Sequence, residues 1–111
     1  MNKTVLVKNR FESATLNIDD ILYIKQDERN MRVFFPEGSE WEHCTMDDMI
    51  CRIDDSCIFR CHHSLAVNLD HIHTFISCRE IKLDNGTILT MCRAAWLKVK
   101  KAWENRYYLD M

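Results

Sequence analysis

The stretch from Ile58 to Ile72 constrains the fold more than any other part of the sequence. Its first residues, 58–63, alternate between two faces with the period of two that is typical of a β-strand. A short apolar piece, residues 65–67, follows and is ended by the turn formers Asn68 and Asp70. The stretch therefore predicts a strand-rich fold with short connections.

The same stretch carries many polar side chains. A guanidinium, two imidazoles, a hydroxyl and an amide fall within nine positions, at Arg60, His62, His63, Ser64 and Asn68. Such groups suit either contacts to phosphates and base edges or an internal network that holds a loop. Both interpretations stay open. We expect Arg60 and His62 to point inward or along the sheet, with His62 hydrogen-bonded to the backbone, and Asn68 to lie in a turn.

Further β-rich segments occupy most of the chain. The expected strands are residues 4–8, 14–16, 21–25, 31–35, 40–44, 74–77, 80–83 and 87–91. The expected turns are residues 17–20, 26–30, 36–39 and 78–79. Asp84-Asn85-Gly86 predicts a type I′ hairpin, because Asn-Gly tolerates the positive φ angles that this turn requires.

Two segments have helical periodicity instead. Thr45 is suited to cap a helix that ends near Asp54, and its apolar stripe is formed by Met46, Met49, Ile50 and Ile53. A second helix is predicted from Arg93, with its apolar residues at 95 or 96, 99, 102 or 103, and 107.

The string Phe59-Arg60-x-His62-x-Ser64-x-x-Val67-Asn68-x-x-x-Ile72 resembles the signature segment of the LytTR DNA-binding domain of bacterial transcription regulators. The segments 21–24, 83–86 and 92–98 are similar to its early strand, its last hairpin and the opening of its C-terminal helix. The resemblance covers nearly the whole chain. It implies a single domain, residues 1–111, and a mostly β, LytTR-like elongated stack of antiparallel sheets with a short middle helix and a C-terminal helix.

The function implied by the resemblance is sequence-specific double-stranded DNA binding in bacterial transcription regulation, without catalysis and without a cofactor. Loops between strands would read the major grooves. The DNA-binding residues carried over are Arg29, Asn30, Arg32, Arg60, His63, Arg93, Lys98 and Lys101. Arginine suits guanine and asparagine suits adenine, whereas the two lysines would hold phosphates. Met31 and His63 depart from residues frequent in the family, which leaves the base preference open.

The resemblance also implies partners and a setting. Repeated DNA half-sites, self-association as a dimer on DNA and a cytoplasmic location are expected. Family members commonly follow a phosphorylated receiver domain in two-component response regulators, and this chain has no room for one. No apolar run approaches the roughly 18 residues of a membrane-spanning helix, so no membrane partner is expected.

The charge distribution partly opposes DNA binding. The net charge is −2, whereas DNA-binding domains usually carry a basic surface. Residues 1–11 and 93–111 each carry +3, residues 12–55 carry −8, and residues 56–92 are balanced. Basic charge is therefore concentrated towards the two ends of the sequence.

Two alternative functions follow from other features. The acidic middle segment favours a protein-interaction module of the same fold that lacks specific DNA binding. The histidines and cysteines, among them His71-x-His73 and Cys61, suggest a metal or redox sensor as a further alternative. A structural zinc site usually needs two pairs of ligands, and no cysteine pair matches His71-x-His73, so no metal site is expected. The six cysteines, at 44, 51, 57, 61, 78 and 92, are expected to be reduced and buried.

Overall fold

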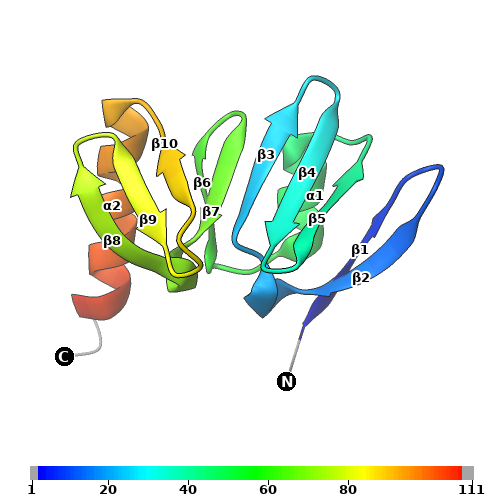
Figure 1. Ribbon diagram of the computed structural model, residues 1–111, viewed down its shortest axis with the longest axis horizontal. Coiled ribbons are helices and arrows are strands. Elements are labelled where there is room, and N and C mark those ends of the chain that lie inside the picture. The colour runs from blue at the N-terminus through cyan, green and yellow to red at the C-terminus, as the bar shows by residue number, and fades with distance from the viewer. Residues whose placement is uncertain (1–2, 109–111) are drawn as a thin grey trace. The chain divides into compact units, whose positions relative to one another are not determined.

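The computed structural model describes residues 3–108, with the backbone alone at Tyr108, and the chain divides into two compact units that meet between Asn68 and Leu69 (Figure 1). All strand pairs in both units are antiparallel. The predicted mostly β architecture with a short middle helix and a C-terminal helix is confirmed.

The first unit contains two sheets. Strands β1 (Thr4–Lys8) and β2 (Ser13–Asn17) form a two-stranded sheet, followed by the 3-10 turn η1 (Ile18–Asp20). The second sheet has the order β5-β4-β3-β7-β6. Its strands are β3 (Tyr23–Asp27), β4 (Asn30–Phe35), β5 (Gly38–Glu42), β6 (Ile58–His62) and β7 (Leu65–Asn68).

Helix α1 (Met46–Ile53) forms where the sequence predicts it. The Thr45 hydroxyl accepts a hydrogen bond from the Asp48 backbone N–H at 3.0 Å, which satisfies one of the donors left open at a helix start. Met46, Met49 and Ile53 are buried and join core residues from β1, β3 and β4. The methionine-rich stripe is therefore core, as predicted.

The second unit contains the 3-10 turn η2 (Leu69–His71), strands β8 (Ile72–Ser77), β9 (Glu80–Leu83) and β10 (Ile88–Thr90), and helix α2 (Arg93–Tyr108). The strands pair in the order β10-β9-β8. Ala95 and Val99 of α2 are buried, and Phe75 of β8 contacts the rings of Trp96 and Trp103 at centroid distances of 5.6 Å and 5.3 Å. Neither helix in the described range is long and apolar enough to cross a membrane.

Two strands are shifted by two residues at both ends relative to their predicted bounds, and β8 begins two residues earlier than predicted, at Ile72. The strand predicted over residues 21–25 is Tyr23–Asp27, and the strand predicted over 40–44 is Gly38–Glu42. At the turn side of each strand the shift arises because the hairpin turn is shorter than predicted: Asp27 pairs with Asn30, and Phe35 pairs with Gly38. Only two residues remain in each turn, so the outer residues of the two predicted turns belong to the paired strands.

The turn at Asp84-Asn85-Gly86 is not type I′, contrary to the prediction. Type I′ needs positive φ at both central residues, but among described non-glycine residues positive φ occurs at Glu28 and Asp54 alone. The Gly86 N–H donates to the Leu83 carbonyl at 3.0 Å, and the Leu83 N–H donates to Thr87 at 2.8 Å. The loop therefore holds three residues, with the positive φ of 93° at Gly86.

The cysteines are less buried than predicted. All six are free thiols; Cys57 and Cys61 are buried and Cys44 is partly buried. Cys51, Cys78 and Cys92 are exposed, so the expectation is wrong for these three. Cys51 lies in α1, Cys78 in the β8–β9 turn and Cys92 directly before α2.

Candidate nucleic-acid interface

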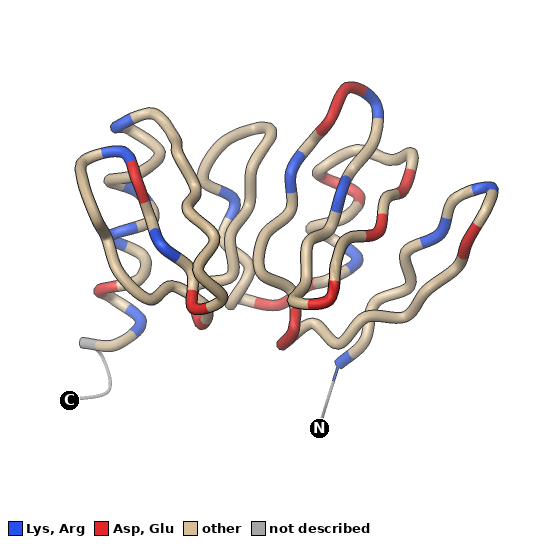
Figure 2. The backbone as a smooth tube through the Cα atoms, viewed as in Figure 1, with Lys and Arg blue, Asp and Glu red and all other residues tan. Residues whose placement is uncertain are grey.

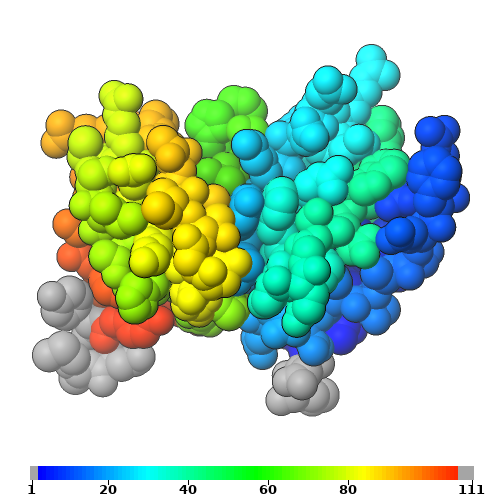
Figure 3. Space-filling model, in the orientation of Figure 1, coloured from blue at the N-terminus to red at the C-terminus, as the bar shows by residue number. Residues whose placement is uncertain are grey.

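The β3–β4 turn presents the first group of candidate residues. It consists of Glu28 and Arg29, with Glu28 in the left-handed region at a φ of 57°. The Gln26 side chain donates to the Glu28 carbonyl at 3.1 Å and fixes this backbone conformation. Arg29 is exposed at the tip, and Asn30 is half-buried as the first residue of β4. Figure 3 shows this turn protruding from the surface of the first unit.

Arg32 lies on the sheet rather than at the turn. It stands between Lys25 of β3 and Trp41 of β5 in the strand register. Its Nη1 donates to the Ser39 hydroxyl at 3.0 Å, and the side chain is half-buried. This places Arg32 two residues along β4 from Asn30, with its guanidinium directed towards β5.

The β6–β7 turn lies at the same end of the five-stranded sheet as the β3–β4 turn. Strand β7 pairs with β3 in the antiparallel sense, with Lys25 opposite Leu65. The Gln26 N–H donates to the Ser64 carbonyl at 2.9 Å, so the ladder continues into the turn. His63 and Ser64 therefore lie beside the end of β3 that leads into Arg29 (Figure 1).

Arg60 is bound within the first unit. Its Nη1 forms an ion pair with Asp47 in the first turn of α1. Its Nη2 donates to the His63 carbonyl at 3.0 Å, and its Nε donates to the His62 carbonyl at 3.4 Å. The guanidinium thus connects α1 to the backbone of the β6–β7 turn.

The two histidines of this turn are both exposed. His62 does not point inward, but it is hydrogen-bonded to the backbone as predicted: its Nδ1 accepts from the Ser64 N–H at 3.3 Å and lies 2.9 Å from the Ser64 hydroxyl. The ring centroids of His62 and His63 are 4.0 Å apart. His62 therefore braces the turn, and His63 is presented to solvent beside it.

Asn68 is also placed differently from its prediction. It is fully buried at the end of β7, and its Nδ2 donates to the Ile21 carbonyl at 2.8 Å. Its backbone N–H donates to the Leu22 carbonyl at 3.0 Å. These two hydrogen bonds attach β7 to the segment that leads into β3. They also satisfy the carbonyls of Ile21 and Leu22, which are buried residues.

The second unit carries the three remaining candidates on α2. Arg93 is the first residue of the helix, and the Trp96 N–H donates to the Cys92 carbonyl at 3.0 Å to close the first turn. Arg93, Lys98 and Lys101 are exposed, whereas Ala95 and Val99 are buried. Within residues 69–108, the Arg93 side chain forms no ion pair or hydrogen bond, so its five donors are available for a ligand.

Charge around these residues is mixed. Figure 2 shows acidic and basic positions next to one another at the β3–β4 turn, where Asp27 and Glu28 precede Arg29. Part of the acidic middle segment is neutralised internally: Glu42 pairs with Arg52, and Asp47 pairs with Arg60. The net charge of −8 already includes Arg52, so only the pair with Arg60, which lies outside residues 12–55, offsets part of it.

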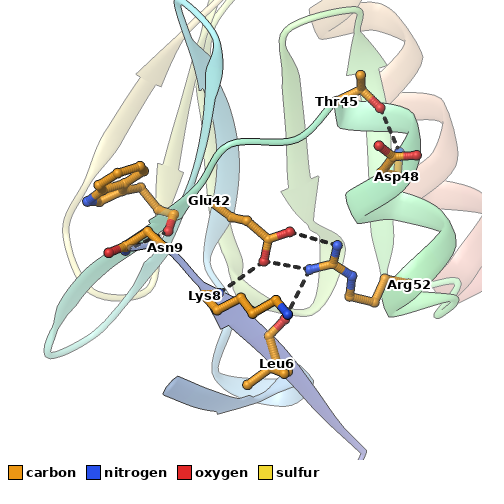
Figure 4. Close-up of polar contacts among 8 residues, drawn as sticks. Leu6, Lys8, Asn9, Glu42, Thr45, Asp48 and Arg52 are labelled. Carbon is orange, nitrogen blue, oxygen red and sulfur yellow. Dashed lines mark hydrogen bonds and ion pairs between the residues drawn. The ribbon is translucent and has the colours of Figure 1, made fainter. Parts of the chain in front are cut away.

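A partly buried ion pair joins α1 to β5 in the same unit (Figure 4). The Arg52 guanidinium donates to both oxygens of Glu42, at 2.8 Å and 2.7 Å, and the Lys8 N–H donates to the same carboxylate at 3.0 Å. These hydrogen bonds, chiefly those from Arg52, lower the pKa of Glu42.

The histidines and cysteines that suggest a metal sensor are not gathered around one position in residues 3–108. Among residues 3–108, no three histidine, cysteine or acidic side chains are grouped for metal binding. The imidazole of His71 instead lies 2.8 Å from an Asp84 oxygen, connecting η2 to the β9–β10 loop.

The structure separates the candidates into two sets. Arg29, Asn30 and His63 lie at or next to two neighbouring turns at one end of the five-stranded sheet. Arg60 binds the backbone of the His63 turn, and Arg32 lies further along β4. Arg93, Lys98 and Lys101 lie on one helix of the other unit. The sequence interpretation missed Asp47 as the partner of Arg60, and no local pattern indicates that pairing.

Together, these features define a mostly β domain with exposed arginine and histidine side chains on turns between strands and at a helix start, and a half-buried asparagine at the start of β4. Residues 12–104 match the family described as the LytTr DNA-binding domain. The chain belongs to this LytTR family, which is a family of DNA-binding domains.

A solved structure supports the fold assignment. The chain is similar to the LytTr DNA-binding domain of a protein described as a methyl-accepting/DNA response regulator from Bacillus cereus. The TM-score is 0.74 at 16% sequence identity, and the match covers 89% of this chain and 94% of that domain. A search of curated proteins gave no significant match.

Proposed function

We propose that this chain binds double-stranded DNA sequence-specifically and thereby regulates bacterial transcription. The observation that carries the proposal is the pair of turns at one edge of the five-stranded sheet, which presents Arg29, Asn30 and His63 together. The proposed activity is binding without chemical conversion. Its place is the cytoplasm, where bacterial DNA lies.

Base reading is assigned to the turns and to the start of α2. Arg29 and Arg93 are exposed and can each donate two hydrogen bonds to a guanine edge, whereas Asn30 can bond adenine. His63 offers one ring nitrogen as donor or acceptor, according to its tautomer. These residues stand on short turns or at a helix terminus, so little freedom is lost when they bind.

Phosphate contacts are assigned to Lys98 and Lys101. Both are exposed on α2, and a lysine ammonium binds phosphate as a point charge without distinguishing bases. Arg32 can add a contact with the donors that its bond to Ser39 leaves available.

Arg60 is proposed to act mainly through His63. Three of its nitrogens already bond to Asp47, His62 and His63, so the side chain is held against the turn. We assign it the role of a positioning residue that fixes the His63 backbone, in addition to any contact from its remaining donors.

The site is expected to work in pairs. Repeated half-sites on DNA, occupied by two copies of the chain, would double the number of base contacts available to a domain of this size.

The salt dependence of DNA affinity tests the proposal. If about 4 to 6 phosphates are neutralised, the slope of log K against log salt should be about −4 to −5. A slope near zero, or no binding at low salt, would contradict the proposal and favour the protein-interaction module suggested by the acidic middle segment.

A further inference from the structure

A hollow of about 520 Å³ lies next to the proposed reading turn, within the first unit. It is lined by Lys8, Asn9 and Arg10 from the β1–β2 connection, by Asn30, and by Trp41, Glu42 and His43 at the end of β5. Asn30 therefore belongs both to the turn region proposed to read bases and to the wall of this hollow. Figure 1 shows the β1–β2 and β3–β4 turns at the same end of this unit.

The β1–β2 turn is fixed in place rather than loose. The Asn9 Oδ1 accepts from the N–H groups of Phe11 and Glu12 at 2.9 Å and 3.1 Å, which closes a local turn. The Asn9 Nδ2 donates to the Trp41 carbonyl at 3.0 Å and attaches the turn to β5 (Figure 4). One amide side chain thus sets the position of the residues on both sides of it.

The cations of the hollow are available to a ligand. Within the described residues, the Lys8 ammonium and the Arg10 guanidinium form no hydrogen bond or ion pair with an acidic group. Arg10 lies over the Phe11 ring at 4.9 Å, which limits its rotamers while its N–H donors stay open. Phe11 itself is 73% exposed, so this arrangement stands at the surface.

The one carboxylate in the lining does not oppose an anion strongly. Both oxygens of Glu42 accept hydrogen bonds from Arg52, and one of them also accepts from the Lys8 N–H. Its charge is therefore compensated inside the unit. Besides Glu42, the residues that line the hollow are two cationic residues, two asparagines, a histidine and Trp41.

We propose that this hollow binds a backbone phosphate of the same DNA duplex that the β3–β4 turn reads. Arg10 and Lys8 would hold the phosphate oxygens, and the Trp41 ring would pack against the adjoining deoxyribose. The inference rests on the proposed DNA binding. It adds the β1–β2 turn as a contact element, and the shared residue Asn30 makes a duplex a better occupant than a free phosphate compound.

The test is the salt slope of DNA affinity in Arg10→Ala and Lys8→Ala, with Lys3→Ala as the matched control. Lys3 precedes the other end of β1 and donates to the Asp54 carbonyl at 3.2 Å, away from the hollow. Each hollow variant should weaken binding of all duplexes alike and make the slope shallower by about 1, while the control keeps the parent slope. The order of preference among DNA sites should stay unchanged.

Other outcomes separate the two proposals. If the parent binds duplex DNA but Arg10→Ala and Lys8→Ala keep its slope, the hollow assignment is overturned and the proposed function stands. If the parent binds no duplex, both fail. Inorganic phosphate should not shift the Trp41 indole resonance at concentrations where duplex DNA does. An equal shift by phosphate alone would assign the hollow to free anions and overturn the duplex proposal.

Discussion

Arg60 holds His63 by its backbone: the Nη2 of Arg60 donates to the His63 carbonyl at 3.0 Å. The same guanidinium is anchored to α1 through Asp47, so the turn that presents His63 is connected to the core helix. A side chain that reaches DNA from this turn would therefore depend on a residue that stands behind it.

Arg60→Ala should lower DNA affinity mainly through His63. Because the two residues share one hydrogen-bonded turn, their effects should not add: the double variant Arg60→Ala/His63→Ala should bind about as weakly as the weaker single variant. A double-mutant cycle on DNA affinity measures this coupling, which for contacting residues is about 0.5–3 kcal/mol. Additive effects would show that Arg60 contacts DNA independently.

Arg93→Ala should reduce both affinity and discrimination. Arg93 is exposed at the start of α2, so its backbone is fixed by the helix while its guanidinium can reach a base edge. The loss on the preferred site should be about 1–3 kcal/mol, with a flatter ranking of sites. Competition binding with a panel of duplexes gives both quantities.

Lys98→Ala is the matched control for Arg93. It removes a charge from the same helix, and it should weaken all sequences alike because a phosphate contact carries no base information. If Arg93→Ala also leaves the ranking of sites intact, α2 does not read bases.

Glu42→Gln should destabilise the fold by about 1–3 kcal/mol at neutral pH, because the Arg52 guanidinium loses its ionic partner. The hydrogen bonds from Arg52 lower the folded-state pKa of Glu42 from its ordinary value of 4.5. The stabilisation is thus fully present above pH 4.5 and is lost as pH falls through the lowered pKa.

Urea unfolding of the parent and of Glu42→Gln at several pH values checks this prediction. The difference in unfolding free energy should be constant near neutrality and should shrink in acid. Glu37→Gln, an exposed change in the β4–β5 turn, should behave like the parent at every pH. A difference that grows on acidification would contradict the assigned pKa direction.

Cysteine accessibility gives a further prediction. Cys51, Cys78 and Cys92 should react with iodoacetamide in the native protein, whereas Cys57 and Cys61 should react only after unfolding. Burial raises the pKa of the Cys44 thiol to about 11, so Cys44 should alkylate slowly.

Mild peroxide tests the alternative of a redox switch. If peroxide abolishes DNA binding by the parent but not by Cys61→Ser, the protein is a redox switch.

Local signals predicted some elements closely. The bounds of α1 follow from Thr45 and the spacing of Met46, Met49 and Ile53, all of which act within one or two helical turns. The start of α2 at Arg93 likewise agrees with the prediction. The bounds of β3 and β5 were less predictable, because they depend on which residues pair across two-residue turns.

The candidate site was predictable only in part. Its residue types are visible in the sequence, but their directions depend on partners far along the chain. Asn68 is buried because its amide reaches Ile21, 47 positions earlier, and Arg60 turns towards Asp47, 13 positions earlier. Residues that share a strand can therefore serve the core, a turn or the surface, according to the elements that pack beside them.

Selection of bound sequences from a random duplex pool tests the central proposal most directly. Sequence-specific binding by this chain predicts enrichment of a repeated motif, and selection with Arg93→Ala should relax that motif at specific positions. Failure of the parent to enrich any motif, even at low salt, would contradict sequence-specific DNA binding.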